Sequence, residues 1–433
     1  MRPRPAMLLF RFLALTLLAT LASARAHALG QPRFVTNSPD RGALALAAGG
    51  KAIPIKVDST DFPGVIRAAH DLQADIQRVT GISPQFVGDQ NNLAKLSGEV
   101  VLIGTVGKSA TIDRLVREHK IDVHQIAGKW ESTLVQVVEK PLPGVARALV
   151  IAGSDKRGTI FGIYDLSEQI GVSPWYWWAD VPVTHRDALY ILPGSYVQGE
   201  PAVKYRGIFL NDEAPALSGW THDTFGGMNH QFYTKVFELL LRLRANYLWP
   251  AMWGNAFNAD DTLNPVLADQ YGIVMGTSHH EPMLRAQQEW KRYGTGPWDY
   301  NKNANTLDSF WTTGIRHMDH HESIVTVGMR GDGDMPMEEG SNIKLLEKIV
   351  ADQRAILQKV TGKPASATPQ SWALYKEVQD YYDKGMRVPD DITLLLCDDN
   401  WGNVRKLPLL DEKPRAGGYG LYYHFDYVGG PRN

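Results

Sequence analysis

Acidic and aromatic clusters follow a series of short apolar segments in the second half of the chain. One acid after a strand is ordinary, but chemically rich ends on strand after strand predict a single site built from several loops on one rim. Carboxylates, an arginine and tryptophans together are typical of a site that handles a sugar. In order, the clusters read NDE at 211–213, WPAMW at 249–253, HHE at 279–281, RGDGD at 330–334 and DDNW at 398–401.

Two kinds of carboxyl group are needed to hydrolyse a glycosidic bond. One is protonated and aids the leaving oxygen, and the other is ionised and acts as a nucleophile or activates water. For any single acid, an exposed loop residue or a helix N-cap is the ordinary interpretation. Their joint placement at successive strand ends favours catalysis. The candidates are Asp212, Glu213, Asp332, Asp334, Glu377, Asp398 and Asp399.

Arg330 lies one strand period from Asp332 and Asp334, with Gly331 and Gly333 in the same loop. A guanidinium group matches a carboxylate in two-pronged geometry better than an ammonium group does. Arg330 therefore predicts either a substrate that carries an acid group or a structural arginine–aspartate pair, and the sequence leaves both open. The two glycines allow backbone bends that place several side chains on one side.

Other polar and aromatic motifs permit more than one interpretation. The indoles of Trp249, Trp253 and Trp401 could stack on a sugar ring, although core packing is the ordinary role of any one of them. Two His-His-Glu runs, at 279–281 and 320–322, hold ligand types that zinc prefers. Neither has the His-Glu-x-x-His spacing, and adjacent histidine side chains are expected to point apart, so no metal is predicted.

A glycine-bounded run at 153–158 precedes an expected helix, where backbone N–H groups could hold an anion. It lacks the glycine and lysine spacing of a phosphate-binding loop. We therefore predict an ordinary turn with a helix cap.

Composition limits the classes of partner. The 433 residues leave room for an export signal and about two domains. The 45 basic and 47 acidic side chains nearly cancel, so charge favours neither nucleic acid nor an anionic membrane surface as a partner. Apolar stretches stay short of the ~20 residues that span a membrane.

The N-terminus has the order of a secretory signal. Arg2 and Arg4 precede an apolar stretch at 12–22 and a small-residue site that ends at Ala28. We predict a signal peptide at 1–28 and export to a bacterial periplasm or exterior. The single cysteine, Cys397, cannot form an internal disulfide and is predicted to be buried in the core.

The first half predicts a small α/β domain, because apolar strands alternate with helices. We assign this domain to 29–192 and expect a linker rich in proline and glycine at 192–202. The expected strands cover 53–57, 100–104, 134–138 and 148–152, and the expected helices cover 65–79, 111–119 and 159–171.

The second half, 200–433, repeats the order strand, loop, helix. With the chemistry at the carboxyl ends of strands, this order predicts a (β/α)8 TIM-type barrel. A doubly wound open sheet is the alternative, but it would concentrate the chemistry at one switch point. We expect a barrel truncated before its last strand, and hence a fragment, because only seven strands are found. They are expected at 205–210, 246–249, 272–275, 324–329, 367–372, 392–397 and 421–425.

Several long motifs resemble glycoside hydrolase family 115, and the resemblance extends over essentially the whole chain after residue 28. The resemblance implies an α-glucuronidase that removes glucuronic acid, or its 4-O-methyl ether, from xylan side branches with inversion and without a cofactor. It also implies a small α/β domain, a catalytic barrel, further C-terminal domains and a homodimer of the longer protein. The motifs are AGSDKRGT at 152–159, RGIFLNDE at 206–213, YLWPAMW at 247–253, GTSHHEPM at 276–283 and the run 374–403.

The resemblance also implies roles for individual residues. It indicates Glu377 as the general acid, whereas pattern alone places this residue in the middle of a helix. The base comes from the 330–334 loop, and the choice between Asp332 and Asp334 stays open. The residues implied to bind the substrate are Asn211, Asp212, Trp249, His279, His280, Arg330, Asp398, Asn400 and His424.

The predicted function is an exported xylan α-1,2-glucuronidase acting on glucuronoxylan or xylo-oligosaccharides. One alternative is another two-domain glycosidase, such as a hexosaminidase-type enzyme, which would need a paired Asp-Glu beside the amide of its substrate. The other alternative is a non-catalytic glycan-binding fragment, motivated by the missing strand.

Overall fold

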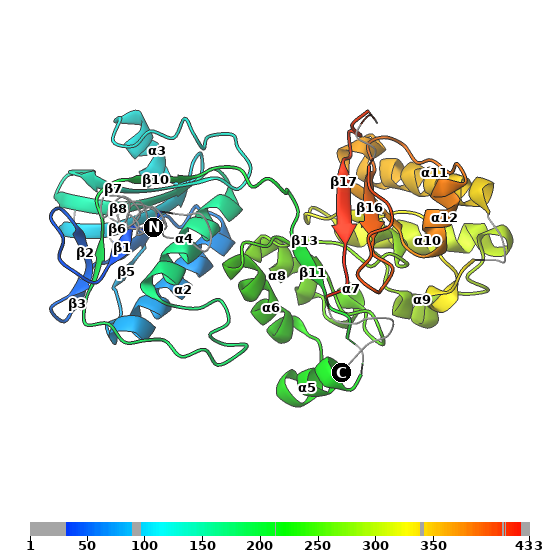
Figure 1. The fold of residues 1–433 in the computed structure, drawn as a ribbon, viewed down its shortest axis with the longest axis horizontal. Coiled ribbons are helices and arrows are strands. Elements are labelled where there is room, and N and C mark those ends of the chain that lie inside the picture. Colours follow the sequence, from blue (N-terminus) through cyan, green and yellow to red (C-terminus); the bar gives the residue numbers. More distant parts are fainter. Residues whose placement is uncertain are drawn as a thin grey trace, which may run out of the picture.

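The computed structural model describes residues 32–88, 97–212, 214–337, 342–408, 411 and 413–425. The predicted signal peptide at 1–28 and the candidate acid Glu213 therefore lie outside the described residues. The chain forms a mixed α/β fold, in which the first half and the second half lie side by side (Figure 1).

The first half is built on a mixed six-stranded sheet in the order β10-β7-β8-β6-β4-β5. Side chains of β6 alternate between its two faces: Val101 and Ile103 pack with α2 and α4, whereas Val100 and Leu102 pack with α3. The strands are β4 (Ile55–Val57), β5 (Phe86–Val87), β6 (Gly98–Thr105), β7 (Thr133–Glu139), β8 (Val145–Gly153) and β10 (Ser195–Gln198). The helices are α2 (Pro63–Thr80), α3 (Ala110–Arg117) and α4 (Lys156–Ile170).

Helix α4 ends as the sequence predicts, but it begins at Lys156 rather than after Gly158. The Asp155 side chain accepts a hydrogen bond from the Gly158 backbone N–H, and Gly171 ends the helix with a φ of 110°. The start of the run 153–158 is therefore a turn with a cap, as predicted, and its last three residues belong to the first turn of the helix.

Two parts of the first half differ from the prediction. A second, antiparallel sheet in the order β1-β9-β2-β3 was not predicted, because its strands are short and distant in sequence. The predicted linker at 192–202 is also wrong in part, since β10 pairs with β7 and extends the first sheet. The additional strands are β1 (Val35–Thr36), β2 (Leu44–Ala48), β3 (Lys51–Ala52) and β9 (Leu189–Ile191).

The second half contains parallel strands that neighbour one another in chain order. They form one three-stranded and one four-stranded sheet, joined by a parallel bridge between Met275 and Ser323. Among the described residues, no pairing joins β11 to β17, so the two sheets do not close into a ring. The strands are β11 (Gly207–Phe209), β12 (Tyr247–Trp249), β13 (Val274–Met275), β14 (Val325–Thr326), β15 (Gln370–Leu374), β16 (Thr393–Cys397) and β17 (Tyr419–Tyr422).

Helices follow these strands along the chain. Leu346, Ile349 and Val350 on one face of α11 are buried, as their helical spacing predicts. Cys397, at the end of β16, is buried as expected. The helices are α5 (Ala216–Phe225), α6 (His230–Arg242), α7 (Phe257–Asp260), α8 (Leu263–Tyr271), α9 (Gln287–Tyr293), α10 (Tyr300–Met318), α11 (Ile343–Thr361) and α12 (Glu377–Asp383), with short 3-10 turns η2 (Pro282–Leu284), η3 (Asp332–Asp334) and η4 (Ala365–Ala367).

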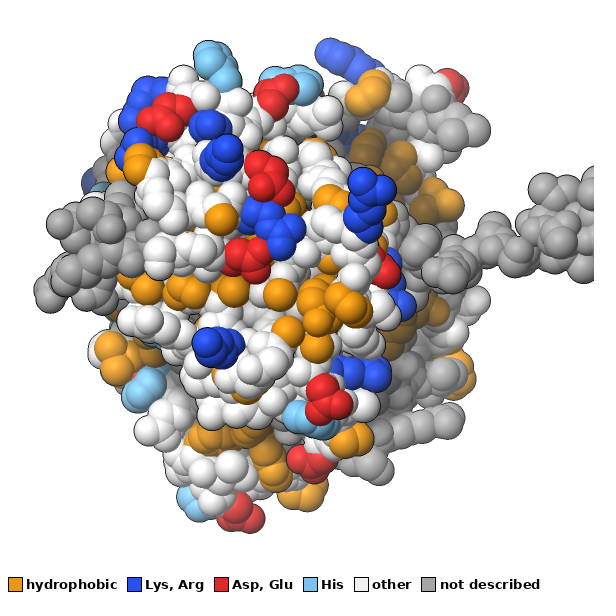
Figure 2. Space-filling model, turned by 90° about the vertical axis from the view of Figure 1, so that its left-hand side faces the viewer, with side chains coloured by type: hydrophobic (Ala, Val, Ile, Leu, Met, Phe, Trp, Pro, Cys, Tyr) orange, Lys and Arg blue, Asp and Glu red, His pale blue; other side chains and the backbone are white. Residues whose placement is uncertain are grey.

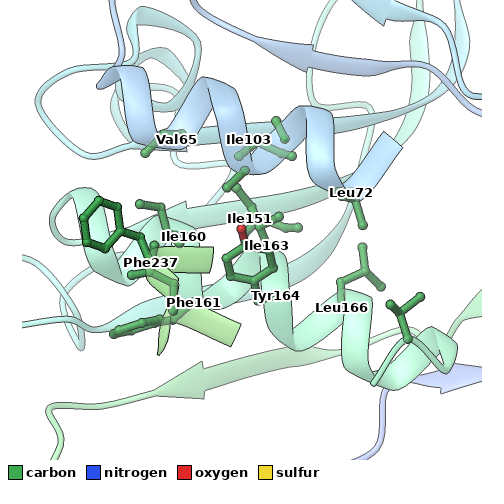
Figure 3. Close-up of a cluster of buried hydrophobic side chains, with 14 of the residues drawn as sticks. Val65, Leu72, Ile103, Ile151, Ile160, Phe161, Ile163, Tyr164, Leu166 and Phe237 are labelled. Atoms are coloured by element: carbon green, nitrogen blue, oxygen red, sulfur yellow. The ribbon is translucent and has the colours of Figure 1, made fainter. Parts of the chain in front are cut away.

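The two halves share one apolar core. Ile160 and Phe161 of α4 belong to the same buried cluster as Phe237 of α6 (Figure 3). Burying this surface removes apolar area from water and fixes the first half against the helices of the second.

A buried ionic network joins the halves at the amino ends of the parallel strands. Glu131 accepts hydrogen bonds from Arg157 Nε at 2.7 Å, Arg206 Nη2 at 2.6 Å and Asn246 Nδ2 at 2.6 Å. Arg157 also pairs with Glu322. Arg206, Asn246 and Glu322 each lie just before a strand, so the first half covers the amino-end rim and leaves the carboxyl-end rim to the loops.

Two observations concern nucleic acid and membranes as partners, namely the surface charge and the apolar character of the helices. On the face of the first half shown in Figure 2, acidic and basic side chains are interspersed rather than gathered by sign. Within the described ranges, none of the helices has both the length and the apolar character needed to cross a membrane.

Replacing Glu131 with Gln should destabilise the fold, because it removes the charge that the arginines share. Removing one partner of a buried ion pair costs about 3–5 kcal/mol, which urea denaturation would measure. The matched control is Glu118→Gln, in an exposed pair with Arg114, which should cost less than about 1 kcal/mol. Equal losses in the two variants would contradict this role of the network.

Candidate active site

A buried guanidinium group lies at the centre of the candidate site. The Arg330 side chain is only 1% exposed and comes from the loop that follows β14. Its Nε and Nη2 donate to the two oxygens of Glu377, at 2.9 and 2.8 Å. This two-pronged pair fixes the orientation of both side chains.

Glu377 lies at the carboxyl end of a strand rather than in the middle of a helix. It is the first residue of α12, three positions after β15 ends. Lys376 precedes it with a φ of 51°, a left-handed backbone that breaks the local pattern. The pattern-based placement was therefore wrong, and Glu377 belongs with the other acids at strand ends.

Asp334 occupies the other side of the same guanidinium group. Arg330 Nη1 donates to the Asp334 carbonyl oxygen at 2.6 Å and contacts its carboxylate. His279 Nε2 lies 2.9 Å from Asp334 Oδ1, and Lys376 Nζ lies 3.7 Å from Oδ2. One guanidinium group thus stands between the carboxylates of Glu377 and Asp334.

Asp332 has a different environment. It is exposed, and its Oδ1 accepts a hydrogen bond of 2.5 Å from Gln287 Nε2. Gly333, between the two aspartates, has a φ of 68°, which glycine adopts without strain. The turn therefore directs Asp332 toward α9 and Asp334 toward Arg330.

His279 and His280 both approach Asp334, contrary to the expectation that their side chains point apart. His280 Nδ1 is 3.7 Å from Asp334 Oδ1. The tight turn in which the Glu281 N–H bonds the Ser278 carbonyl brings the two rings to one side. Burial lowers the pKa of each histidine well below its usual range, so both are neutral at pH 7.

The donor atoms of His279, His280 and Asp334 lie within 4.8 Å of one another, a grouping that could hold a metal ion. The Arg330 guanidinium contacts the same carboxylate, and the Lys376 ammonium group lies nearby. These two positive charges oppose a cation there. We therefore interpret the grouping as a carboxylate held by a cation and a neutral imidazole.

Tyrosines connect this centre to the remaining strand ends. The Tyr375 ring lies 4.3 Å from that of His279 between centroids, and its hydroxyl group donates to Asn400 Oδ1 at 3.2 Å. His424 Nδ1 lies 2.5 Å from Asp398 Oδ1, and the ring of Tyr422 lies 4.5 Å from that of His424. Asn400, Asp398 and His424 therefore belong to the same cluster as Arg330.

Other predicted residues mainly support loops and the core. Asp212 is buried and accepts from the backbone N–H groups of Met252 and Trp253 at 3.1 and 3.2 Å. Trp249 is also buried, and its Nε1 donates to the Tyr247 hydroxyl group at 2.6 Å. Neither side chain is open to a ligand in this conformation, whereas Asn211, beside Asp212, is half-buried.

The remaining strand-end candidates lie on the surface. The Asp399 carboxylate accepts from the backbone N–H groups of Trp401 and Asn403 at 3.0 and 3.1 Å, as a loop cap does. Trp401 is 61% exposed and Trp253 is 39% exposed, so these two indoles are open to a ligand. Sequence reasoning did not single out Tyr375, Tyr422, Lys376 or Gln287, although Tyr375 directly follows β15.

Two carboxylates held apart at the carboxyl ends of parallel strands form the kind of site that a glycoside hydrolase uses. A model of the family described as "Glycosyl hydrolase family 115" matches residues 198–433, more than half of the chain. The chain belongs to this family.

A solved structure gives a closer comparison. It is described as "a novel family GH115 4-O-Methyl-alpha-glucuronidase, BtGH115A, with specificity for decorated arabinogalactans". It shares 35% identity at a TM-score of 0.78, over 89% of this chain and 50% of that one. The chain thus spans about half the length of this relative.

Other comparisons add little. An N-acetyl-beta-hexosaminidase from Streptomyces plicatus aligns with 10% identity and a TM-score of 0.48, over 87% of this chain and 76% of that one. That similarity is too weak to carry an argument. Among curated proteins, no significant match was found.

Stability should depend on pH through Glu281, a buried acid of this site. Burial raises the pKa of Glu281 from its usual 4.5 to about 7. Between these values the unfolded chain has lost a proton that the folded chain keeps. The free energy of unfolding should therefore fall as pH rises from 4.5 to 7, by up to about 3 kcal/mol.

The variant Glu281→Gln cannot ionise and should lack this dependence. Urea denaturation of both proteins across the pH range would measure it, as the difference between their free energies of unfolding. His279 and His280 contribute with the opposite sign, but they do so in both proteins and largely cancel. A difference that stays constant with pH would contradict the assignment.

Proposed function

We propose that the chain carries the catalytic site of an inverting glycoside hydrolase that releases α-1,2-linked glucuronic acid or its 4-O-methyl ether. The observation that carries the proposal is the pair of carboxylates, Glu377 and Asp334, on either side of Arg330. The family match supports this reaction over the hexosaminidase-type alternative.

Inversion needs an acid and a base far enough apart to admit a water molecule, about 6.5–9.5 Å. Different nitrogens of one guanidinium group engage the two carboxylates, so that this group stands between them, which suits that requirement. In our proposal, Glu377 acts in its protonated form, in which one of its oxygens carries the proton in place of a hydrogen bond from Arg330, and it gives that proton to the leaving glycosidic oxygen. Asp334 takes a proton from the water that attacks the anomeric carbon.

The choice of Asp334 over Asp332 rests on position. Asp334 faces Glu377 across Arg330, whereas the Oδ1 of Asp332 is engaged by Gln287 on the outer side of the turn. We therefore propose Asp334 as the base and Asp332 as a support of the loop.

The substrate's own carboxylate needs a partner. The fork of Arg330 is filled by Glu377 and its Nη1 contacts Asp334, so in this conformation the partners of Arg330 are the protein's own carboxylates. Lys376 is 48% exposed beside the same carboxylates. We propose that its ammonium group meets the uronate, with the indoles of Trp253 and Trp401 as platforms for the rest of the glycan.

The polysaccharide and the wider setting are also proposals. We propose xylan or xylo-oligosaccharides as the backbone. Because the related 4-O-methyl-α-glucuronidase is described as specific for decorated arabinogalactans, arabinogalactan is the alternative substrate to test. The signal-like N-terminus supports export, and the homodimer of the longer protein stays a prediction.

We further propose that the parallel strands belong to a (β/α)8-type barrel. Their chain order supports it, as does the ring of Phe209 on β11, which lies 6.1 Å from that of Tyr422 on β17.

Glu377→Gln and Asp334→Asn should each lower kcat for uronic acid release by about 100-fold to 10,000-fold, the usual contribution of a general acid or base. Chromatography of products from glucuronoxylan and from glucuronidated arabinogalactan would measure it. Glu99→Gln, in the sheet of the first half, is the control and should retain activity. Full activity of either site variant would refute its role.

A further inference from the structure

The buried carboxyl group of Glu281 closes a loop, and this loop contacts the turn η3 that carries Asp332 and Asp334. Glu281 is 2% exposed. Its Oε2 accepts from Ser278 Oγ at 3.0 Å, and its Oε1 accepts from the Gln287 backbone N–H at 2.8 Å. Its carbonyl oxygen also accepts from Thr277 Oγ1 at 2.5 Å. Glu281 thus forms hydrogen bonds with residues that precede it and with a residue that follows it in the chain.

The loop closed in this way reaches both aspartates. From one side of Glu281, His279 Nε2 bonds Asp334 at 2.9 Å. From the other side, Gln287 Nε2 bonds Asp332 at 2.5 Å. The two contacts hold both ends of the same short turn, η3, from one loop.

The loop is also anchored to the strand that leads to Arg330. Thr326 Oγ1, on β14, donates to the Thr277 carbonyl at 2.7 Å. The anchor, the hydrogen bonds of Glu281 and the two contacts to the aspartates are therefore linked to one another through the backbone of one loop. Burying a carboxyl group costs free energy unless it is hydrogen-bonded, and these contacts offset that cost.

We propose that Glu281 is a positioning residue that fixes the 277–287 loop and, through His279 and Gln287, holds Asp334 and Asp332 in place. The proposal rests on the function proposed above. Among the described contacts, none joins Glu281 directly to Asp332, Asp334 or Glu377, so it acts by geometry rather than by proton transfer.

Glu289 offers a matched control. It is also buried and lies on α9, where it accepts from the Ala286 backbone N–H at 2.8 Å and pairs with Arg285 at 3.0 Å. Among the described contacts, none joins it to either aspartate. A loss that comes from general destabilisation should therefore affect Glu281→Ala and Glu289→Ala alike.

Crystal structures of Glu281→Ala and Gln287→Ala test the geometry without any assay. We expect Glu281→Ala to lose both the His279–Asp334 and the Gln287–Asp332 hydrogen bonds, and Gln287→Ala to shift Asp332 alone. If both contacts persist in Glu281→Ala, the proposal is overturned, whether or not the protein is a glucuronidase.

Kinetics test the consequence. Glu281→Ala should lower kcat for uronic acid release on the order of 100-fold with little change in KM, as misplacement by about 1 Å does. Glu281→Gln can still accept from the Gln287 N–H and can donate its amide N–H to Ser278 Oγ, so it should restore kcat, and Glu289→Ala should keep it. An active wild type with unchanged kcat in Glu281→Ala would overturn the proposal. An inactive wild type would instead refute the proposed function and leave the decision to the crystal structures.

Discussion

The site depends on one buried positive charge. Arg330 lies among the strand ends almost without solvent, and a charge in that position is tolerated only when it is paired. Glu377 and Asp334 provide the pairing from two sides. Each carboxylate is held by the same guanidinium group, which therefore stands between them. Removing the charge would leave two acids to repel each other.

The residues that join the two halves and the candidate catalytic residues lie at opposite ends of the parallel strands. Glu131 and Arg157 join the first half to the amino ends of the parallel strands, and the candidate catalytic residues lie at the carboxyl ends. Such a division is usual in folds of parallel strands, where the carboxyl-end loops can vary without disturbing the core. The small α/β half therefore stabilises the amino ends of the parallel strands, opposite the ends that carry the candidate site.

Part of the candidate site could be predicted from sequence, because the carboxyl ends of parallel strands lie at one edge of a sheet. The clusters at His279, Arg330 and Asp398 came from that rule, and the structure brings all three together. Glu377 was also a candidate acid, but the pattern placed it in the middle of a helix, because periodicity cannot show the left-handed backbone at Lys376 that puts Glu377 at the start of α12.

Long-range contacts could not be predicted. The pairing of β10 with β7 joins residues far apart in sequence, so a segment rich in proline and glycine resembled a linker. The burial of Asp212 and Trp249 also depends on tertiary packing rather than on residue type. Likewise, His279 and His280 both approach Asp334 because of a tight turn, and the residue types in that turn do not predict its geometry.

The central claim is that Glu377 and Asp334, held apart by Arg330, act as acid and base in a single displacement. Proton NMR of the first sugar released from an α-glucuronoside tests it most directly, because the anomeric signals separate the two outcomes. The account predicts that the β-anomer of glucuronic acid appears first and then equilibrates. Initial appearance of the α-anomer would show retention and contradict it.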